Sequence, residues 1–243
     1  MNNYNLGLQN MRSVLGEMSI FNGNLVGSLQ TGYKQSRLSY GGSGSTQING
    51  SLQTPDTNLT MDHTSVDFGQ GTIVNTGAKT DYAINGSGFF LLQQAQDVGV
   101  NPPNLLSRDG SFHVATITGL GSVLVNNNGL VALRDTSGTG SGPFVPLTQT
   151  DLDSGLRPSI LNPQDSLDSL QFSKNHGSRI FEFSGGLTNG DGILVEGALE
   201  ASNSDVAGTM AAMSMHTKQF QAMAAQIKVE QSSIDTVLSL FKT

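Results

Sequence analysis

One heptad pattern near the C-terminal end of the chain most limits what this sequence can fold into. Mostly apolar or small residues recur every three or four positions from residue 206 to residue 241, with no proline among them. This spacing is typical of a helix with one contact face. Asn203 or Ser204 can cap its start, with Asp205 in the first turn. We predict one helix over 204–241, about 57 Å long. The pattern comprises Val206, Met210, Met213, Thr217, Phe220, Ala224, Ile227, Gln231, Ile234, Leu238 and Phe241.

A second, weaker helical pattern lies at the N-terminal end. Its apolar residues are spaced 3, 4, 3 and 4 from residue 11 to residue 25, which predicts a helix within residues 1–30. Two helices alone would leave apolar surface in water, so we expect them to bind each other and neighbouring copies of the chain. The alternative is a long helix that packs only on its own domain. The predicted assembly interface consists of Met11, Val14, Met18, Phe21, Leu25, Val206, Met210, Met213, Phe220, Ile227, Ile234 and Leu238.

Between the two helices the sequence has the pattern of antiparallel β-structure. Short apolar runs alternate with turn dipeptides such as Asn85-Gly86 and Asn128-Gly129, which favour tight hairpins. The predicted fold class is α+β: N- and C-terminal helices pair as a coiled coil, and a central antiparallel β-rich domain forms a sandwich or barrel. The predicted strands are 72–76, 81–85, 88–93, 111–118, 122–126, 130–134, 178–183 and 193–199.

The composition of successive segments predicts the domain organisation. Residues 1–35 together with 203–243 form an inner helical coiled-coil domain from both ends of the chain. Residues 36–65 are rich in Gly, Ser and other polar residues and are expected to form an extended loop. Residues 66–202 form an outer β-rich domain.

Composition and charge exclude several classes of function. The 243 residues include no cysteine, which excludes thiolate metal sites and thiol nucleophiles. The net charge is −7 and no segment carries a run of basic residues, which argues against nucleic-acid binding. The sequence has no apolar stretch of about 18–20 residues, so we predict no membrane span. The N-terminal residues lack the pattern of a cleaved secretory signal.

No arrangement of residues in the sequence predicts catalysis, a cofactor or a metal. The histidines lack the spacing of metal ligands, and two of the candidate carboxylates, Asp109 and Asp191, precede glycine in turns. The run 86–88 (GSG) precedes a strand and lacks the lysine of a phosphate-binding loop. We predict no enzyme, and a carboxylate pair formed only in three dimensions is the alternative. The residues considered are His63, His113, His176, His216, Asp81, Asp109, Asp191 and Glu196.

Four blocks of sequence occur in an order that is specific as a set. They are 24–34 (NLVGSLQTGYK); 67–77 (DFGQGTIVNTG) with 81–90 (DYAINGSGFF); 107–112 (SRDGSF) with 123–129 (VLVNNNG); and 197–206 (GALEASNSDV). They are similar to NLANxxTxGFK, FSQGxLxxTGxxxDxAIxGxGFF, YTRDGxF with its LVxxxG continuation, and GxLExSNVD. In these blocks, which span nearly the whole chain, the sequence resembles the rod and hook family, the axial proteins of the bacterial flagellar basal body.

The resemblance implies a structural role. Members of the family combine an inner coiled-coil domain from both termini with an outer β domain. They stack into a helical tube around a channel, and they leave the cell through the flagellar type III export apparatus without a cleaved signal. The expected partners are therefore copies of the chain, other axial proteins and that apparatus, and the expected location is the periplasm-spanning rod. We expect Gly32, Gly77, Gly86, Gly88 and Gly110 to serve turns or close approaches.

The distance between blocks separates the subtypes of the family. The segment between Gly129 and Gly197 is too short for the extra outer domain of hook proteins, which favours a rod protein. Residues 44–50 (GSTQING) resemble a hook segment, so a minimal hook-type subunit stays an alternative. A secreted monomeric β-domain adhesin or binding module is the rival from another class. Within the motifs, we also expect an ion pair between Asp81 and Arg108.

Overall fold

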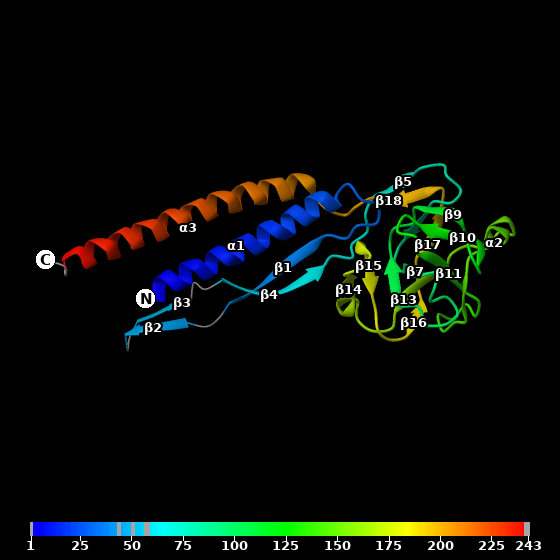
Figure 1. The fold of residues 1–243 in the computed structure, drawn as a ribbon, viewed down its shortest axis with the longest axis horizontal. Coiled ribbons are helices and arrows are strands. Elements are labelled where there is room, and N and C mark those ends of the chain that lie inside the picture. The colour runs from blue at the N-terminus through cyan, green and yellow to red at the C-terminus, as the bar shows by residue number, and fades with distance from the viewer. Residues whose placement is uncertain (1, 43–44, 50–51, 56–58, 241–243) are drawn as a thin grey trace. The chain divides into compact units, whose positions relative to one another are not determined.

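The computed structural model describes residues 2–42, 45–49, 52–55 and 59–240 (Figure 1). The chain divides into two compact units. The first, here called the helical unit, comprises Met1–Val26, Ser36–Asp67 and Asp205–Thr243. The second, here called the β unit, comprises Gly27–Gln35 and Phe68–Ser204. The residues that directly follow the first helix thus belong to the β unit, whereas the sequence placed residues 1–35 in one helical domain.

Both predicted terminal helices are present. Helix α1 runs from Asn2–Gly27 and helix α3 from Val206–Leu240. Helix α3 begins directly after Asp205, whose carbonyl accepts a hydrogen bond from the Thr209 amide at 2.9 Å. The absence of proline lets the backbone hydrogen bonds of α3 continue without a break.

The predicted pairing of these helices as a coiled coil is wrong. The helices do touch: the Ile227 side chain lies 3.3 Å from the position that a Cβ on Gly7 would occupy. The heptad positions of α3 are not buried as a seam, because Met210 and Ile234 are 53% and 52% exposed. Thr217, Ala224 and Gln231 on the seam are too small or too polar to serve as the apolar knobs of a coiled coil.

The segment 36–65, predicted to be an extended loop, instead contains four strands. Strand β1 (Ser36–Gly42) pairs antiparallel with β4 (Leu59–Val66), and β2 (Ser45–Asn49) pairs antiparallel with β3 (Leu52–Pro55). The polar composition misled the prediction, because a strand pair is held by backbone hydrogen bonds and needs no apolar face.

The β unit is built on one sheet of ten strands, all of its pairs antiparallel. The main path runs in the order β14-β15-β8-β7-β11-β10-β9, with β12 beside β11, β13 beside β7 and β16 beside β13. Two further pairs, β17 with β6 and β18 with β5, complete the unit. The sheet strands are β7 (Phe89–Gln93), β8 (Leu105–Ser107), β9 (Phe112–Ile117), β10 (Gly121–Asn126), β11 (Val131–Asp135), β12 (Phe144–Pro146), β13 (Ile160–Pro163), β14 (Gln171–Ser173), β15 (Gly177–Glu182) and β16 (Leu187–Asn189). The paired strands are β5 (Ile73–Asn75), β6 (Tyr82–Asn85), β17 (Ile193–Glu196) and β18 (Ala198–Glu200), and the short helices are α2 (Gln149–Asp153) and a 3-10 turn at Leu167–Ser169.

The core of the β unit lies where β6, β7, β10 and β11 meet. Its buried residues are aromatic or aliphatic, and consecutive residues of the central strand β7 are all buried, so this strand is covered on both faces. The aromatic rings meet at angles, with Phe90 and Phe112 edge to face at 5.3 Å between centroids. The core residues are Tyr82, Ile84, Phe90, Leu92, Leu105, Phe112, Leu124, Leu130, Ala132, Leu147 and Ile180. Among the described residues, no helix is both long and apolar enough to cross a membrane.

Candidate functional site

Three charged side chains are buried together in the β unit, and we call them the charge cluster: Lys34, Arg108 and Glu200. The Lys34 Nζ lies 2.7 Å from Glu200 Oε1, and the Arg108 Nη1 lies 3.2 Å from Glu200 Oε2. The side chains of Lys34 and Glu200 are fully buried, and that of Arg108 is 4% exposed. Burying three charges costs several kcal/mol each unless they are paired and hydrogen-bonded. The burial of these three charges therefore depends on their being paired with one another.

Backbone groups supply the remaining hydrogen bonds of the lysine and the glutamate. The Lys34 ammonium donates to the Gly69 carbonyl at 2.7 Å. The Glu200 Oε1 also accepts the Gly71 N–H at 2.8 Å. The loop between β4 and β5 thus wraps around the carboxylate and the ammonium together. The Lys34–Glu200 pair is satisfied as a buried ion pair must be.

Arg108 connects the cluster to the turn after β6. Its Nη2 donates to the Gly86 carbonyl at 2.7 Å, and its Nη1 donates to the Ile84 carbonyl at 3.3 Å. The guanidinium carbon lies 5.3 Å from the centroid of the Phe89 ring, a favourable cation–π distance. Burial lowers the pKa of Arg108, and the neighbouring Glu200 carboxylate opposes that shift.

The expected ion pair between Asp81 and Arg108 is not formed. Asp81 Oδ2 instead accepts a hydrogen bond from the Thr76 hydroxyl at 2.6 Å. Arg108 takes Glu200 as its counter-ion. The sequence prediction identified the arginine but selected the wrong acid. Glu200 is buried beside the guanidinium, whereas Asp81 is only partly buried.

Backbone N–H groups hold the chain segment that follows α1 next to this cluster. The Gly32 N–H donates to the Glu200 carbonyl at 2.8 Å, and the Gln35 N–H donates to the Asn203 side-chain oxygen at 2.7 Å. The Asn203 side-chain amide in turn donates to Gly69 at 3.1 Å. The segment that leaves α1 and the segment that leads to α3 are therefore held at the same place in the β unit.

Asp109 extends the network to the segment after α1. Its Oδ1 accepts from the Thr31 hydroxyl at 2.7 Å and from the Ser111 hydroxyl at 2.7 Å. Its Oδ2 pairs with the Arg179 guanidinium. Asp109 is itself buried, and these partners satisfy the hydrogen-bonding capacity of its two carboxylate oxygens. The sequence explained this aspartate by its turn alone.

Two of the glycines expected to allow close approaches do so at this site. Gly32 has φ +66°, and a Cβ there would lie 2.3 Å from the backbone nitrogen of Asp109. A Cβ on Gly110 would lie 1.7 Å from the Tyr82 carbonyl oxygen. Neither position has room for a side chain, so the segments can meet only because these residues are glycine.

The predicted assembly residues lie in the helical unit with very different exposure. Val14 is buried, whereas Val206, Met210 and Ile234 are exposed. The half-buried members are Met11, Met18, Phe21, Leu25, Met213, Phe220 and Ile227, and the side chain of Leu238 lies outside the described residues. Their assembly role stays a prediction.

A second polar feature lies between α1 and α3. His216 Nδ1 lies 2.8 Å from Glu17 Oε2, although the geometry is not that of a hydrogen bond, and the imidazole stacks at 5.2 Å on Phe21. Burial raises the pKa of Glu17, and His216 partly opposes the rise. A cavity of about 250 Å³ beside this pair is also lined by Asn10 and Met223. The sequence treated His216 as an isolated histidine and missed this contact.

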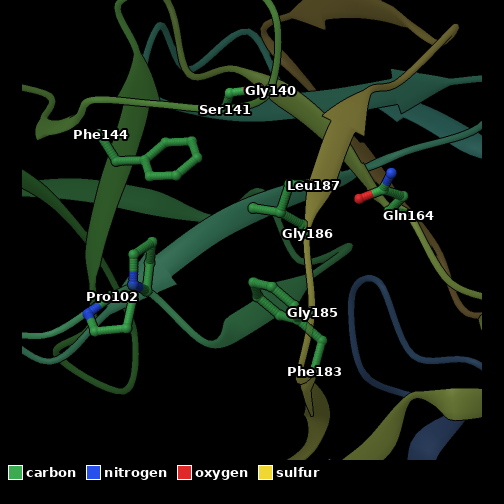
Figure 2. A pocket seen from close by; sticks show the side chains of 10 residues that line it. Pro102, Gly140, Ser141, Phe144, Gln164, Phe183, Gly185, Gly186 and Leu187 are labelled. Atoms are coloured by element: carbon green, nitrogen blue, oxygen red, sulfur yellow. The ribbon is translucent and has the colours of Figure 1, made fainter.

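The β unit also contains an open hollow of about 320 Å³, shown in Figure 2. The Phe144 ring from β12 projects into the space bounded by Pro102 and Leu187, with Gln164 at the opposite rim. Three glycines also line it, and none of the described residues of its lining carries a charged side chain. It offers van der Waals contact and one amide, but no group for acid–base chemistry.

The described residues contain no group of three or more His, Cys, Asp or Glu side chains placed to hold a metal ion. No protein-family model matches the sequence, and a comparison with curated proteins gives no match. Among the described residues, the charge cluster is the polar site whose charged side chains are most completely buried and paired. Its signal in the sequence is the presence of Lys34, Arg108 and Glu200 within glycine-rich blocks of a chain that has only 13% charged residues.

Proposed function

We propose that the chain is a structural subunit of the bacterial flagellar axis, most like a rod protein, which assembles into a helical tube that transmits torque and encloses the export channel. One observation carries the proposal: all four blocks that resemble the family contribute to the charge cluster. Lys34 belongs to the first block, Gly69 and Gly86 to the second, Arg108 to the third and Glu200 to the fourth. A shared structural role explains why blocks far apart in sequence meet at one point.

The cluster suits a subunit that carries mechanical load. Residues 28–35 follow α1, and residues 200–204 lead to α3. Both segments are fixed within the β unit by hydrogen bonds and buried ion pairs. A force applied through either helix therefore enters the β unit through anchored chain and not through a free linker.

The exposed apolar residues of the helices support contacts with other subunits. Met215 and Val229 are 60% and 66% exposed, and their separation of two heptads places them on the same side of α3. In this proposal these two side chains make contact with a neighbouring subunit. In this proposal the partners are copies of the chain, other axial proteins and the type III export apparatus. In the same proposal the chain reaches the periplasm-spanning rod through that apparatus and works without catalytic turnover or a cofactor.

The decisive test charges this surface at two positions whose side chains are mostly exposed. The double variant Met215→Asp with Val229→Asp should be exported but should fail to enter the flagellum. A strain that lacks the native gene and expresses only this variant should therefore stay non-motile. The matched control is Ser232→Asp, which adds a charge at an exposed polar position of the same helix. Normal motility with the double variant would contradict the proposal, and so would equal loss of motility with the control.

A further inference from the structure

Three Asn-Gly pairs lie outside the helices in the described part of the chain: Asn85-Gly86, Asn128-Gly129 and Asn189-Gly190. All three asparagines are exposed. Asn-Gly is the dipeptide most prone to deamidation, because glycine has no Cβ to hinder attack by its own backbone nitrogen on the preceding side-chain amide. A folded chain prevents this reaction by holding the glycine N–H and the asparagine side chain in place.

Two of the three pairs are protected at both groups. The Gly129 N–H donates to the Asn126 carbonyl, and the Asn128 side chain donates to the His176 carbonyl. The Gly190 N–H donates to the Ile160 carbonyl at 2.9 Å. The Asn189 side chain donates to the carbonyl of Gly138. Backbone acceptors within the fold therefore restrain both reacting groups of each pair.

The pair Asn85-Gly86 is protected differently. The Gly86 N–H donates to the side-chain Oε1 of Gln70 at 2.8 Å, and the Gln70 amide donates to the Ile84 carbonyl at 2.8 Å. Gln70 is exposed, so water competes for both bonds. In the described part of the chain the Asn85 side chain makes no hydrogen bond. The side chain of one exposed glutamine thus restrains the Gly86 N–H in this turn.

We propose that Asn85 is the site at which this protein deamidates in its folded state, and that Gln70 sets the rate. When the bond to Gln70 opens, the Gly86 nitrogen attacks the Asn85 side-chain carbonyl carbon. A new C–N bond closes a five-membered succinimide, the Gly86 nitrogen loses its proton to solvent, and ammonia leaves. Water then opens the ring at either carbonyl to give aspartate or isoaspartate. The net change is addition of one water and loss of one ammonia, with no oxidation or reduction.

The modification would act on the charge cluster. Asn85 pairs with Ile193 at the end of β6, and the Gly86 carbonyl accepts the short hydrogen bond from Arg108. Isoaspartate inserts an extra methylene group into the main chain between these two contacts, and either product adds a negative charge at residue 85, directly before the glycine whose carbonyl binds Arg108. A molecule with isoaspartate at this position therefore loses the original position of the Gly86 carbonyl. This inference goes beyond the proposed function and does not depend on it.

The test is peptide mass mapping of the full-length protein during incubation at about pH 8 and 37 °C. In the unchanged protein, Asn85 should deamidate faster than Asn128 and Asn189. Gln70→Ala should raise the rate at Asn85 by about 3- to 10-fold, as loss of one ordinary hydrogen bond allows, and leave the other two sites unchanged. Gln70→Glu retains an acceptor for the Gly86 N–H and should stay near the original rate.

Gln96→Ala is the matched control, because Gln96 is a glutamine of the same unit whose side chain bonds only to Gln94. Equal rates at the three asparagines of the unchanged protein would overturn the proposal. A parallel rise at all three sites in Gln70→Ala would also overturn it, since that result means general opening of the unit and no local restraint.

Discussion

At the scale of single residues, Glu200 is the acid on which the charge cluster depends. Glu200→Gln would leave Lys34 and Arg108 buried without a counter-ion, and breaking a buried pair in this way costs about 3–5 kcal/mol. We expect that loss in the free energy of unfolding of the β unit, measured by urea denaturation at neutral pH.

Glu196→Gln provides the matched control for Glu200→Gln. Glu196 pairs with Arg157 in a half-exposed position, with 42% and 32% of the two side chains accessible. Such pairs contribute about 0–1 kcal/mol. If both variants lost the same small amount of stability, the cluster would not be an organising feature of the unit.

A second prediction concerns Gly32. There the cost of a left-handed backbone can be separated from the cost of steric overlap. Gly32→Ala would place a Cβ against the backbone of Asp109, at a positive φ. Gly99 also has a positive φ, +77°, but nothing lies within 4 Å of its Cβ position. Each alanine should cost roughly 1–2 kcal/mol for the left-handed backbone. Gly32→Ala should cost about 1–3 kcal/mol more for the overlap, and equal thermal stabilities of the two variants would contradict this account.

At the scale of elements, the loop after β11 is organised by one carboxylate. Asp135 is buried, which raises its pKa, but the Gly140 N–H and the hydroxyl and N–H of Ser137 donate to it and hold the pKa below the usual 3.8. These bonds stabilise the charged form. Their contribution is therefore fully present above about pH 4 and is lost as the pH falls through the lowered value.

Asp135→Asn should reveal that dependence on pH. Hydrogen bonds to a charged group contribute about 1.5–3 kcal/mol, so we expect the variant to be less stable than the unchanged protein by roughly this amount at pH 6–7. The difference in thermal unfolding should shrink as the pH falls below about 4. Asp165→Asn removes a charge from an exposed position and serves as the control. A difference that stays constant between pH 7 and pH 3 would show that Asp135 does not act through its charge.

The elements also show what the sequence could and could not predict. Short apolar runs such as 88–93 and turn dipeptides such as Asn85-Gly86 encode strand structure locally, so all eight predicted strands correspond to observed ones. The pairing of β1 with β4 depends on backbone bonds between polar segments, which leave no apolar pattern. The heptad of α3 predicted a helix correctly, but which side of that helix is buried depends on partners such as Glu17 opposite His216.

The candidate site was only partly predictable for a similar reason. Resemblance pointed to the blocks that contain Lys34, Arg108 and Glu200, because glycine-rich patterns around them are visible in one dimension. Which charge pairs with which is decided by desolvation, and desolvation is a property of the closed fold. The sequence therefore led to a predicted ion pair between Arg108 and Asp81 of the preceding block, whereas in the structure Arg108 pairs with Glu200.

At the scale of the whole molecule, two compact units predict two unfolding events. A chain with separate units need not unfold in one step, so calorimetry should show two overlapping transitions. Glu200→Gln should lower only the transition of the β unit, because both ion pairs of the cluster lie within it. Hydrogen exchange followed by mass spectrometry identifies the unit behind each transition. A single transition that shifts as a whole would mean that the units fold as one.

The charge cluster also sets an order of events for a chain that emerges N-terminus first. Lys34 and Glu200 are 166 positions apart, so a chain leaving a ribosome or a narrow conduit carries an unneutralised lysine and, later, an unneutralised Arg108 until most of its length is free. Closing so large a loop is slow compared with forming a helix or a hairpin. Glu200 therefore decides when Lys34 and Arg108 become paired, and the β unit cannot complete its fold while that part of the chain is still in transit.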